Sequence, residues 1–156
     1  MFGPLRARIG YLVARRLFHW AWLVKQPRGW RWLEGQFSRM AALGDTQAQS
    51  FYGHILLFRG QGLGARSEGR RLLGLAANAG DAKAAYQLGA LSLAGDPQHS
   101  ADAPQAIGWW TIAAQAKHPA AAYRLAELYR TGAAGVTADA EKAEHFSQLS
   151  RQLSGL

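Results

Sequence analysis

The chain has 156 residues, of which 49% are hydrophobic and 18% charged, so global disorder is excluded and one domain with a real core is expected. It contains no cysteine, which excludes disulfides, thiolate metal sites and cysteine nucleophiles. The net charge of +8 is uneven, because residues 1–71 carry +9 and residues 72–156 carry −1. This asymmetry predicts an anionic partner for the N-terminal half.

The first predicted element is a long helix over residues 5–25. It lies in an N-terminal segment, residues 1–43, which we expect to cap the helical repeats that follow it. At 100° per residue its side chains form two faces. The face that we expect to seal the end of the helical array consists of Leu5, Ile9, Leu12, Val13, Trp20 and Leu23. The opposite strip, which we predict to bind a partner, consists of Tyr11, Phe18 and Trp22, with Arg8 and Arg15 beside them. The alternative to partner binding is that both faces of this helix are buried in the protein.

Three partners suit this aromatic and arginine strip. Tyr, Trp and Arg are enriched at protein-binding hot spots, which favours another protein or a second copy of the chain. The same composition also suits an anionic membrane surface. Because Arg15 and Arg16 interrupt the apolar run, a signal peptide and a membrane-spanning helix are not expected. We therefore predict a cytoplasmic protein, with a peripheral membrane location as an alternative.

The next elements are a helix over residues 28–43 and a divergent repeat over residues 44–79. A glycine-rich stretch at residues 60–64 is predicted to be the flexible loop of this repeat, because its spacing and helical context do not match a phosphate-binding loop. The arginines that bracket this predicted turn are Arg59, Arg66, Arg70 and Arg71. They predict an anion-binding patch, for which a solvated face is the alternative.

Two further repeats follow at residues 80–116 and 117–152, before a short tail at residues 153–156. The segment AAYQL that begins at Ala84 recurs 37 residues later as AAYRL from Ala121. Apolar residues recur at spacings of three and four, which predicts two helices in each repeat. Self-similarity at this period is typical of helical solenoids.

These motifs resemble the Sel-one-like repeat (SLR) family, a branch of the tetratricopeptide-like solenoids. The residues that carry the resemblance in residues 80–116 are Gly80, Asp81, Ala85, Tyr86, Leu88, Gly89, Asp102, Ala106, Trp109, Trp110, Ala113 and Ala114. Those in the next repeat are Tyr123, Leu125, Gly135, Val136, Asp139, Lys142, Ala143 and Phe146. The resemblance implies an all-α, right-handed solenoid of antiparallel helix pairs, here eight helices in four pairs. It also implies a protein-binding scaffold that docks partners on the first helices of its repeats.

No arrangement of residues predicts an enzyme. Trp109 and Trp110 fall on packing positions of the repeat, so we expect them in the core. The five histidines form no three-ligand set, and only His145 has an acid, Glu141, near it on the same helix. We therefore expect no catalytic residue, no cofactor and no metal. The predicted function is a non-enzymatic protein–protein interaction scaffold. The alternative is a protein that binds an anionic membrane through its basic half; nucleic acid is not expected, because no nucleic-acid-binding motif is present.

Overall fold

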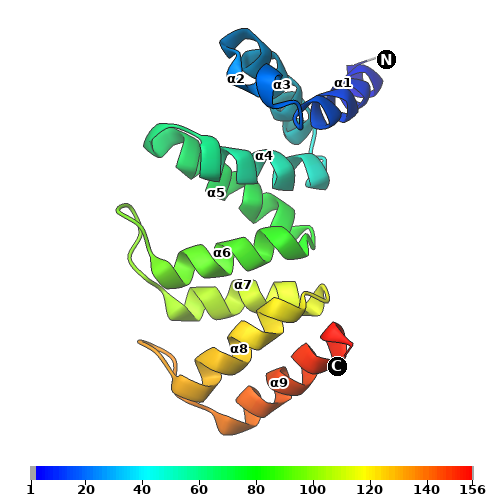
Figure 1. The fold of residues 1–156 in the computed structure, drawn as a ribbon. Helices are drawn as coiled ribbons and strands as arrows, with labels where there is room; N and C mark the ends of the chain where they lie inside the picture. The colour runs from blue at the N-terminus through cyan, green and yellow to red at the C-terminus, as the bar shows by residue number, and fades with distance from the viewer. Residues whose placement is uncertain (1–2, 156) are drawn as a thin grey trace. The chain divides into compact units, whose positions relative to one another are not determined.

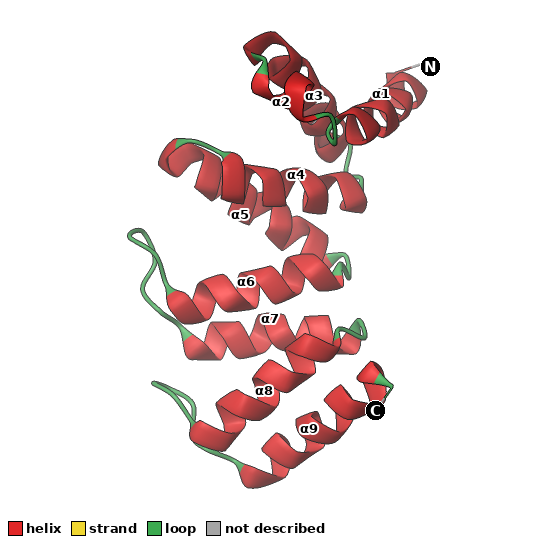
Figure 2. Ribbon diagram, in the orientation of Figure 1, coloured by secondary structure: helices red, strands yellow, loops and turns green. Residues whose placement is uncertain are grey.

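The computed structural model describes residues 3–155, and within them the chain forms nine α-helices and no strand (Figure 2). The helices are α1 (Gly3–Leu17), α2 (Ala21–Lys25), α3 (Pro27–Ala42), α4 (Thr46–Arg59), α5 (Gly62–Asn78), α6 (Ala82–Ala94), α7 (Ala103–Gln115), α8 (Pro119–Thr131) and α9 (Ala140–Ser154). The prediction of an all-α solenoid of antiparallel helix pairs is confirmed.

The chain divides into two compact units, one ending at Leu75 and the other beginning at Ala76. Helices α1 to α4 and most of α5 belong to the first unit (Figure 1). The end of α5 and helices α6 to α9 belong to the second. Each unit is described separately below.

Aspartate side chains fix the beginnings of four helices. The carboxylates of Asp45, Asp81, Asp102 and Asp139 each accept a hydrogen bond from the backbone N–H three residues later, at 2.7–3.0 Å. The first turn of a helix has N–H groups without intrahelical partners, so each such cap stabilises its helix by about 1 kcal/mol. These aspartates therefore stabilise the starts of α4, α6, α7 and α9.

The third repeat begins differently from the two before it. Gly44 and Gly80 precede the capping aspartates of α4 and α6 and have φ angles of 85° and 96°. At the corresponding position before α8, Lys117 has a φ of 64°, and His118 is the N-cap residue without a side-chain capping bond. A left-handed conformation is costly for any residue with a Cβ atom. The junction before α8 therefore differs from the Gly-Asp junctions before α4 and α6.

In the second unit, α6 and α7 pack very closely because one position has no side chain. A Cβ atom at Gly89 would collide with the Cδ1 and Nε1 atoms of Trp110. The Trp110 ring is only 2% exposed, and its Nε1–H donates to the backbone oxygen of Tyr86 at 3.1 Å. The expected core position of Trp110 is thus confirmed, while Trp109 is half-buried.

The core of the first unit is aromatic. The buried ring of Phe37 on α3 packs edge-to-face against Tyr11 of α1 and Phe51 of α4, with ring centroids 6.1 and 5.1 Å apart. Tyr52 is also buried, and its hydroxyl donates to Glu34 at 3.2 Å. Burial, together with the negative charge of Glu34, raises the pKa of Tyr52. These contacts join α1, α3 and α4 into one core.

The predicted long helix over residues 5–25 is wrong in one respect. Helix α1 ends at Leu17, and a turn leads to the separate short helix α2, so the described chain has nine helices instead of the expected eight. The turn places Phe18 against the rings of Phe37 and Phe51, with centroids 6.1 and 5.5 Å away. Packing of this ring into the aromatic core accompanies the break in the helix.

Candidate binding surfaces

The two faces of α1 are reversed relative to the sequence prediction. Tyr11, which we expected on a partner-binding strip, is 4% exposed and lies in the core. Burial raises its pKa. Of the six residues that were expected to seal the array, five are exposed to solvent, namely Leu5, Ile9, Leu12, Val13 and Trp20, and only Leu23 is partly buried. Tyr11 is therefore not available to a partner.

The other residues of the predicted strip have different environments. Phe18 packs against the core, and the guanidinium group of Arg59 lies 4.9 Å from its ring centroid. Arg15 is exposed, but its guanidinium group lies 5.6 Å from the centroid of Phe51. Trp22 is 59% exposed and Arg8 is exposed as well. The residues Tyr11, Phe18 and Trp22 thus form no continuous surface.

Small side chains explain which face of α1 packs inward. Ala7, Gly10 and Ala14 lie on the same side of the helix as Tyr11, at 100° per residue. A Cβ atom at Gly10 would collide with the Oε1 atom of Gln36 on α3, so the Gln36 side chain packs directly against the α1 backbone here. The small residues in the sequence were the signal for the buried face, since bulky residues on the other side could not allow this packing.

The four arginines of the predicted patch do not bracket a single loop. Only two residues separate α4 from α5, and the glycines at positions 62 and 64 belong to the first turn of α5. Arg59 ends α4, whereas Arg66, Arg70 and Arg71 lie along α5, with Arg70 half-buried. The prediction of a flexible loop there is therefore wrong, because the helix continues through these glycines.

Arg71 has an acidic partner of its own. Its guanidinium group donates two hydrogen bonds to the carboxylate of Glu68, at 2.7 and 2.8 Å. This pairing lowers the pKa of Glu68 and raises the pKa of Arg71. Of the four arginines, Arg59 and Arg66 are the two that are exposed and form no ion pair with a carboxylate within residues 3–155.

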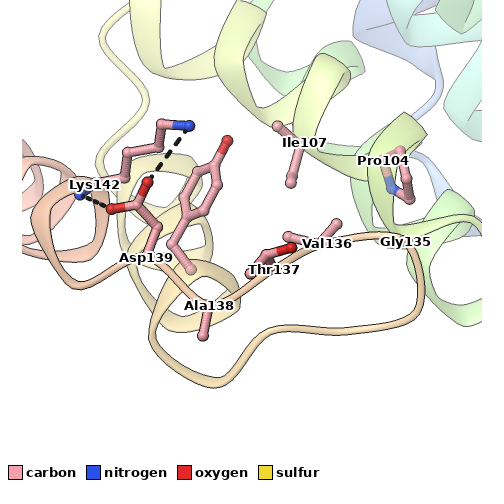
Figure 3. A pocket seen from close by; sticks show the side chains of 9 residues that line it. Pro104, Ile107, Gly135, Val136, Thr137, Ala138, Asp139 and Lys142 are labelled. Atoms are coloured by element: carbon pink, nitrogen blue, oxygen red, sulfur yellow. Dashed lines mark hydrogen bonds and ion pairs between the residues drawn. The ribbon is translucent and has the colours of Figure 1, made fainter.

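A surface hollow of about 420 Å³ lies beside the loop between α8 and α9 (Figure 3). It is lined by Pro104, Ile107, Tyr129, Gly135, Val136, Thr137, Ala138, Asp139 and Lys142. The Asp139 carboxylate accepts from the backbone N–H of Lys142 at 3.0 Å and lies 3.6 Å from its ammonium group. The backbone hydrogen bond is the main cause of the lowered pKa of Asp139. The charged groups of this hollow thus serve to start α9.

A stacked pair of rings joins the second and third repeats. The imidazole of His118 lies on the ring of Tyr86, with centroids 4.6 Å apart and planes 12° from parallel. Burial, with a smaller contribution from Lys83, lowers the pKa of His118, which favours the neutral ring. The Tyr86 ring is covered in this way by the N-cap residue of α8.

Tyr123 occupies the position in the third repeat that Tyr86 occupies in the second, but its ring is 53% exposed. It borders a hollow of about 470 Å³ whose other lining residues are Pro119, Ala120, Ser150, Arg151 and Ser154. Arg151 pairs with Glu144 at 3.1 Å. Sequence reasoning missed Tyr123 as a surface residue, because it used the motif tyrosines only to identify the repeat. The absence of a ring at the position equivalent to His118 was the available signal.

Two kinds of site have no counterpart in the described residues. Between residues 3 and 155, no three His, Asp or Glu side chains are grouped so that they could hold a metal ion. In the same part of the chain, no helix combines the length and the apolar character needed to cross a bilayer.

Comparisons with known proteins agree with this architecture. No curated protein matches the chain significantly in sequence. A solved Sel1 repeat protein from Oxalobacter formigenes is 30% identical, with a TM-score of 0.64, over 74% of this chain and 86% of that protein. A protective antigen of uropathogenic Escherichia coli with an SLR fold is 24% identical, with a TM-score of 0.67, over 77% of this chain. An immunity protein of Pseudomonas aeruginosa is 19% identical, with a TM-score of 0.60, over 83% of this chain.

The chain spans 26% of the length of the antigen and 48% of the length of the immunity protein, so these two similarities concern the fold. The family model described as the Sel1 repeat matches residues 46–81, 82–118 and 119–154, which together make up most of the chain. Three consecutive copies of the motif, on helices that pack as the motif requires, show that this chain belongs to the Sel1 repeat family.

Proposed function

We propose that the chain is a non-enzymatic scaffold that binds another protein through its Sel1 repeats, and that Tyr123 is a central contact. Sel1 repeats generally mediate protein–protein interactions. The single observation that supports Tyr123 as the contact is its exposed ring at the edge of an apolar hollow. Exposed tyrosines beside apolar hollows are frequent anchors in protein interfaces.

The stack of His118 on Tyr86 indicates what kind of group Tyr123 accepts. In the second repeat, a flat ring covers the tyrosine at 4.6 Å. Tyr123 has the equivalent position on α8, so a partner segment that supplies an imidazole, aromatic or proline ring would cover it in the same way. The small side chains of Ala120 and Ser150 leave room for such a ring in the hollow.

The arginines of the first unit are proposed as a second contact, for an acidic segment of a partner protein. Arg59 and Arg66 are exposed at the end of α4 and in the first part of α5. Arginine forms bidentate hydrogen bonds with carboxylates, which favours acidic peptides over other ligands. Binding through these groups should weaken as the salt concentration rises.

Capture from lysate of the source cells tests the proposal. The full chain, Tyr123→Ala and Trp32→Ala are immobilised in equal amounts, and the captured proteins are quantified by mass spectrometry. Trp32 is a suitable control because it is also an aromatic residue that is partly exposed. Loss of a hot-spot ring should reduce capture of the partner by about tenfold or more for Tyr123→Ala, with little change for Trp32→Ala. Equal capture by all three proteins would contradict the assignment of Tyr123.

A further inference from the structure

The outward face of α1 is a continuous strip of exposed apolar side chains. Leu5, Ile9, Leu12 and Val13 are 58%, 56%, 62% and 44% exposed. At 100° per residue they fall within about one quarter of the helix circumference, opposite the buried Tyr11. A soluble helix normally presents polar residues on the side that faces water, so this face indicates that α1 has a ligand.

Arginines surround this apolar strip. Arg8 and Arg15 lie along one edge, Arg6 lies along the other, and Arg16 lies within the strip near the end of the helix; all four are exposed. The first acidic residue of the chain is Glu34, so α1 and α2 contain no negative side chain. An apolar strip edged by arginines is the pattern of a helix that lies in the plane of a membrane surface, where long basic side chains reach the headgroups.

A hollow at the end of α1 adds a place for a headgroup. It has a volume of about 740 Å³ and is lined by Leu12, Arg15, Arg16, His19 and Trp20. Two guanidinium groups and an indole thus surround one concave surface. Tryptophan is enriched at the boundary between lipid tails and headgroups, and the exposed Trp20 lines the same hollow as Leu12 of the apolar strip.

We propose that the outward face of α1 binds the surface of an anionic bilayer, with Leu5, Ile9 and Leu12 entering the interface and the arginines contacting lipid phosphates. A second copy of the chain fits this face less well, because it would bring two sets of unneutralised arginines together. A bilayer supplies both apolar chains and many phosphates. This binding uses the first unit and does not depend on the proposed protein-binding role of Tyr123.

Vesicle sedimentation tests the proposal with the full chain. Vesicles of phosphatidylcholine with about one-third phosphatidylglycerol should sediment the protein, whereas vesicles of phosphatidylcholine alone should sediment on the order of tenfold less. Replacing three exposed apolar residues by Leu5→Ser, Ile9→Ser and Leu12→Ser should reduce binding to the anionic vesicles by about tenfold or more, because their burial in the interface is lost.

Two matched control variants distinguish binding through this face of α1 from the general attraction of a basic protein to anionic vesicles. Phe58→Ser, Leu63→Ser and Leu43→Ser remove three similarly exposed apolar residues elsewhere and should leave binding unchanged. Removal of three charges by Arg6→Gln, Arg8→Gln and Arg16→Gln should weaken binding more than the same loss by Arg39→Gln, Arg31→Gln and Arg124→Gln. Thermal melts of all variants should match the parent, since every changed side chain is exposed.

Failure to sediment with anionic vesicles would overturn the proposal. Equal losses in the test and control variants would also overturn it, because charge alone would then explain the binding. Stable dimers of the parent that the serine variant cannot form would assign the face to a second copy of the chain instead. None of these outcomes affects capture of a protein partner through Tyr123, so the two proposals are tested independently.

Discussion

At the scale of single residues, the missing side chain at Gly89 determines how closely α6 and α7 approach. Trp110 occupies the space where a Cβ atom would lie, and its Nε1–H is held by the backbone oxygen of Tyr86 at 3.1 Å. A ring that is both buried and hydrogen-bonded cannot move aside without breaking that bond. The glycine of the motif is therefore a packing requirement of the second repeat.

Gly89→Leu should lower the free energy of unfolding by about 1–3 kcal/mol or more, because the added side chain overpacks this contact. Urea unfolding followed by circular dichroism measures the change. Gly108→Leu on α7 is the matched control, since a Cβ atom at Gly108 meets nothing within 4 Å and the position is exposed. The control should be neutral or slightly stabilising, because leucine favours helix more than glycine. Equal effects of the two substitutions would show that Gly89 has no special packing role.

Other residues could not be assigned from the sequence at this scale. The motif tyrosines at positions 86 and 123 are identical in type and register, yet the first is covered by His118 and the second is exposed. Exposure depends on what the neighbouring repeat supplies, which a motif read in isolation does not contain. The Trp110 position, in contrast, depends on contacts within one repeat and was predicted correctly.

At the scale of elements, the helices of the repeats were predictable and the orientation of α1 was not. The three- and four-residue spacing of apolar side chains is a local signal for α6 to α9, and capping aspartates mark the starts of α6, α7 and α9. Helix α1 has two faces that are both rich in large apolar residues, so the hydrophobic pattern alone does not identify the buried one. The buried face is instead the one that contains Ala7, Gly10 and Ala14, whose small side chains permit close packing against α3.

Phe18 and Trp22 provide a direct test of this orientation. Phe18→Ser should lower the free energy of unfolding by about 2 kcal/mol or more, because the ring packs against Phe37 and Phe51 in the core. Trp22→Ser should change stability by less than about 0.5 kcal/mol, because the Trp22 side chain is largely exposed. Urea unfolding of each single variant makes the comparison. A larger loss for Trp22→Ser than for Phe18→Ser would contradict the burial assigned to Phe18, after the end of α1, and the exposure assigned to Trp22 on α2.

At the scale of the whole molecule, the uneven charge separates the roles proposed for the two units. The first unit carries the basic residues of α1 to α5, which suit anionic ligands, whereas residues 72–156 have a net charge of −1. The second unit presents an exposed tyrosine and a hollow with few charged groups. Composition alone predicted an anionic partner for the N-terminal half, but it contained no information about the exposed Tyr123 ring in the third repeat.

The central claim is that the chain is a protein-binding scaffold with Tyr123 at the docking surface, and site-specific photocrosslinking tests it most directly. A benzophenone amino acid replaces Tyr123 in one variant and Trp32 in the other, and both full chains are irradiated in source-cell lysate. We predict a covalent adduct with a specific protein from position 123 that is absent or much weaker from position 32, because a ring at position 123 lies against the partner. No protein adduct from position 123, or the same adducts from both positions, would contradict the claim.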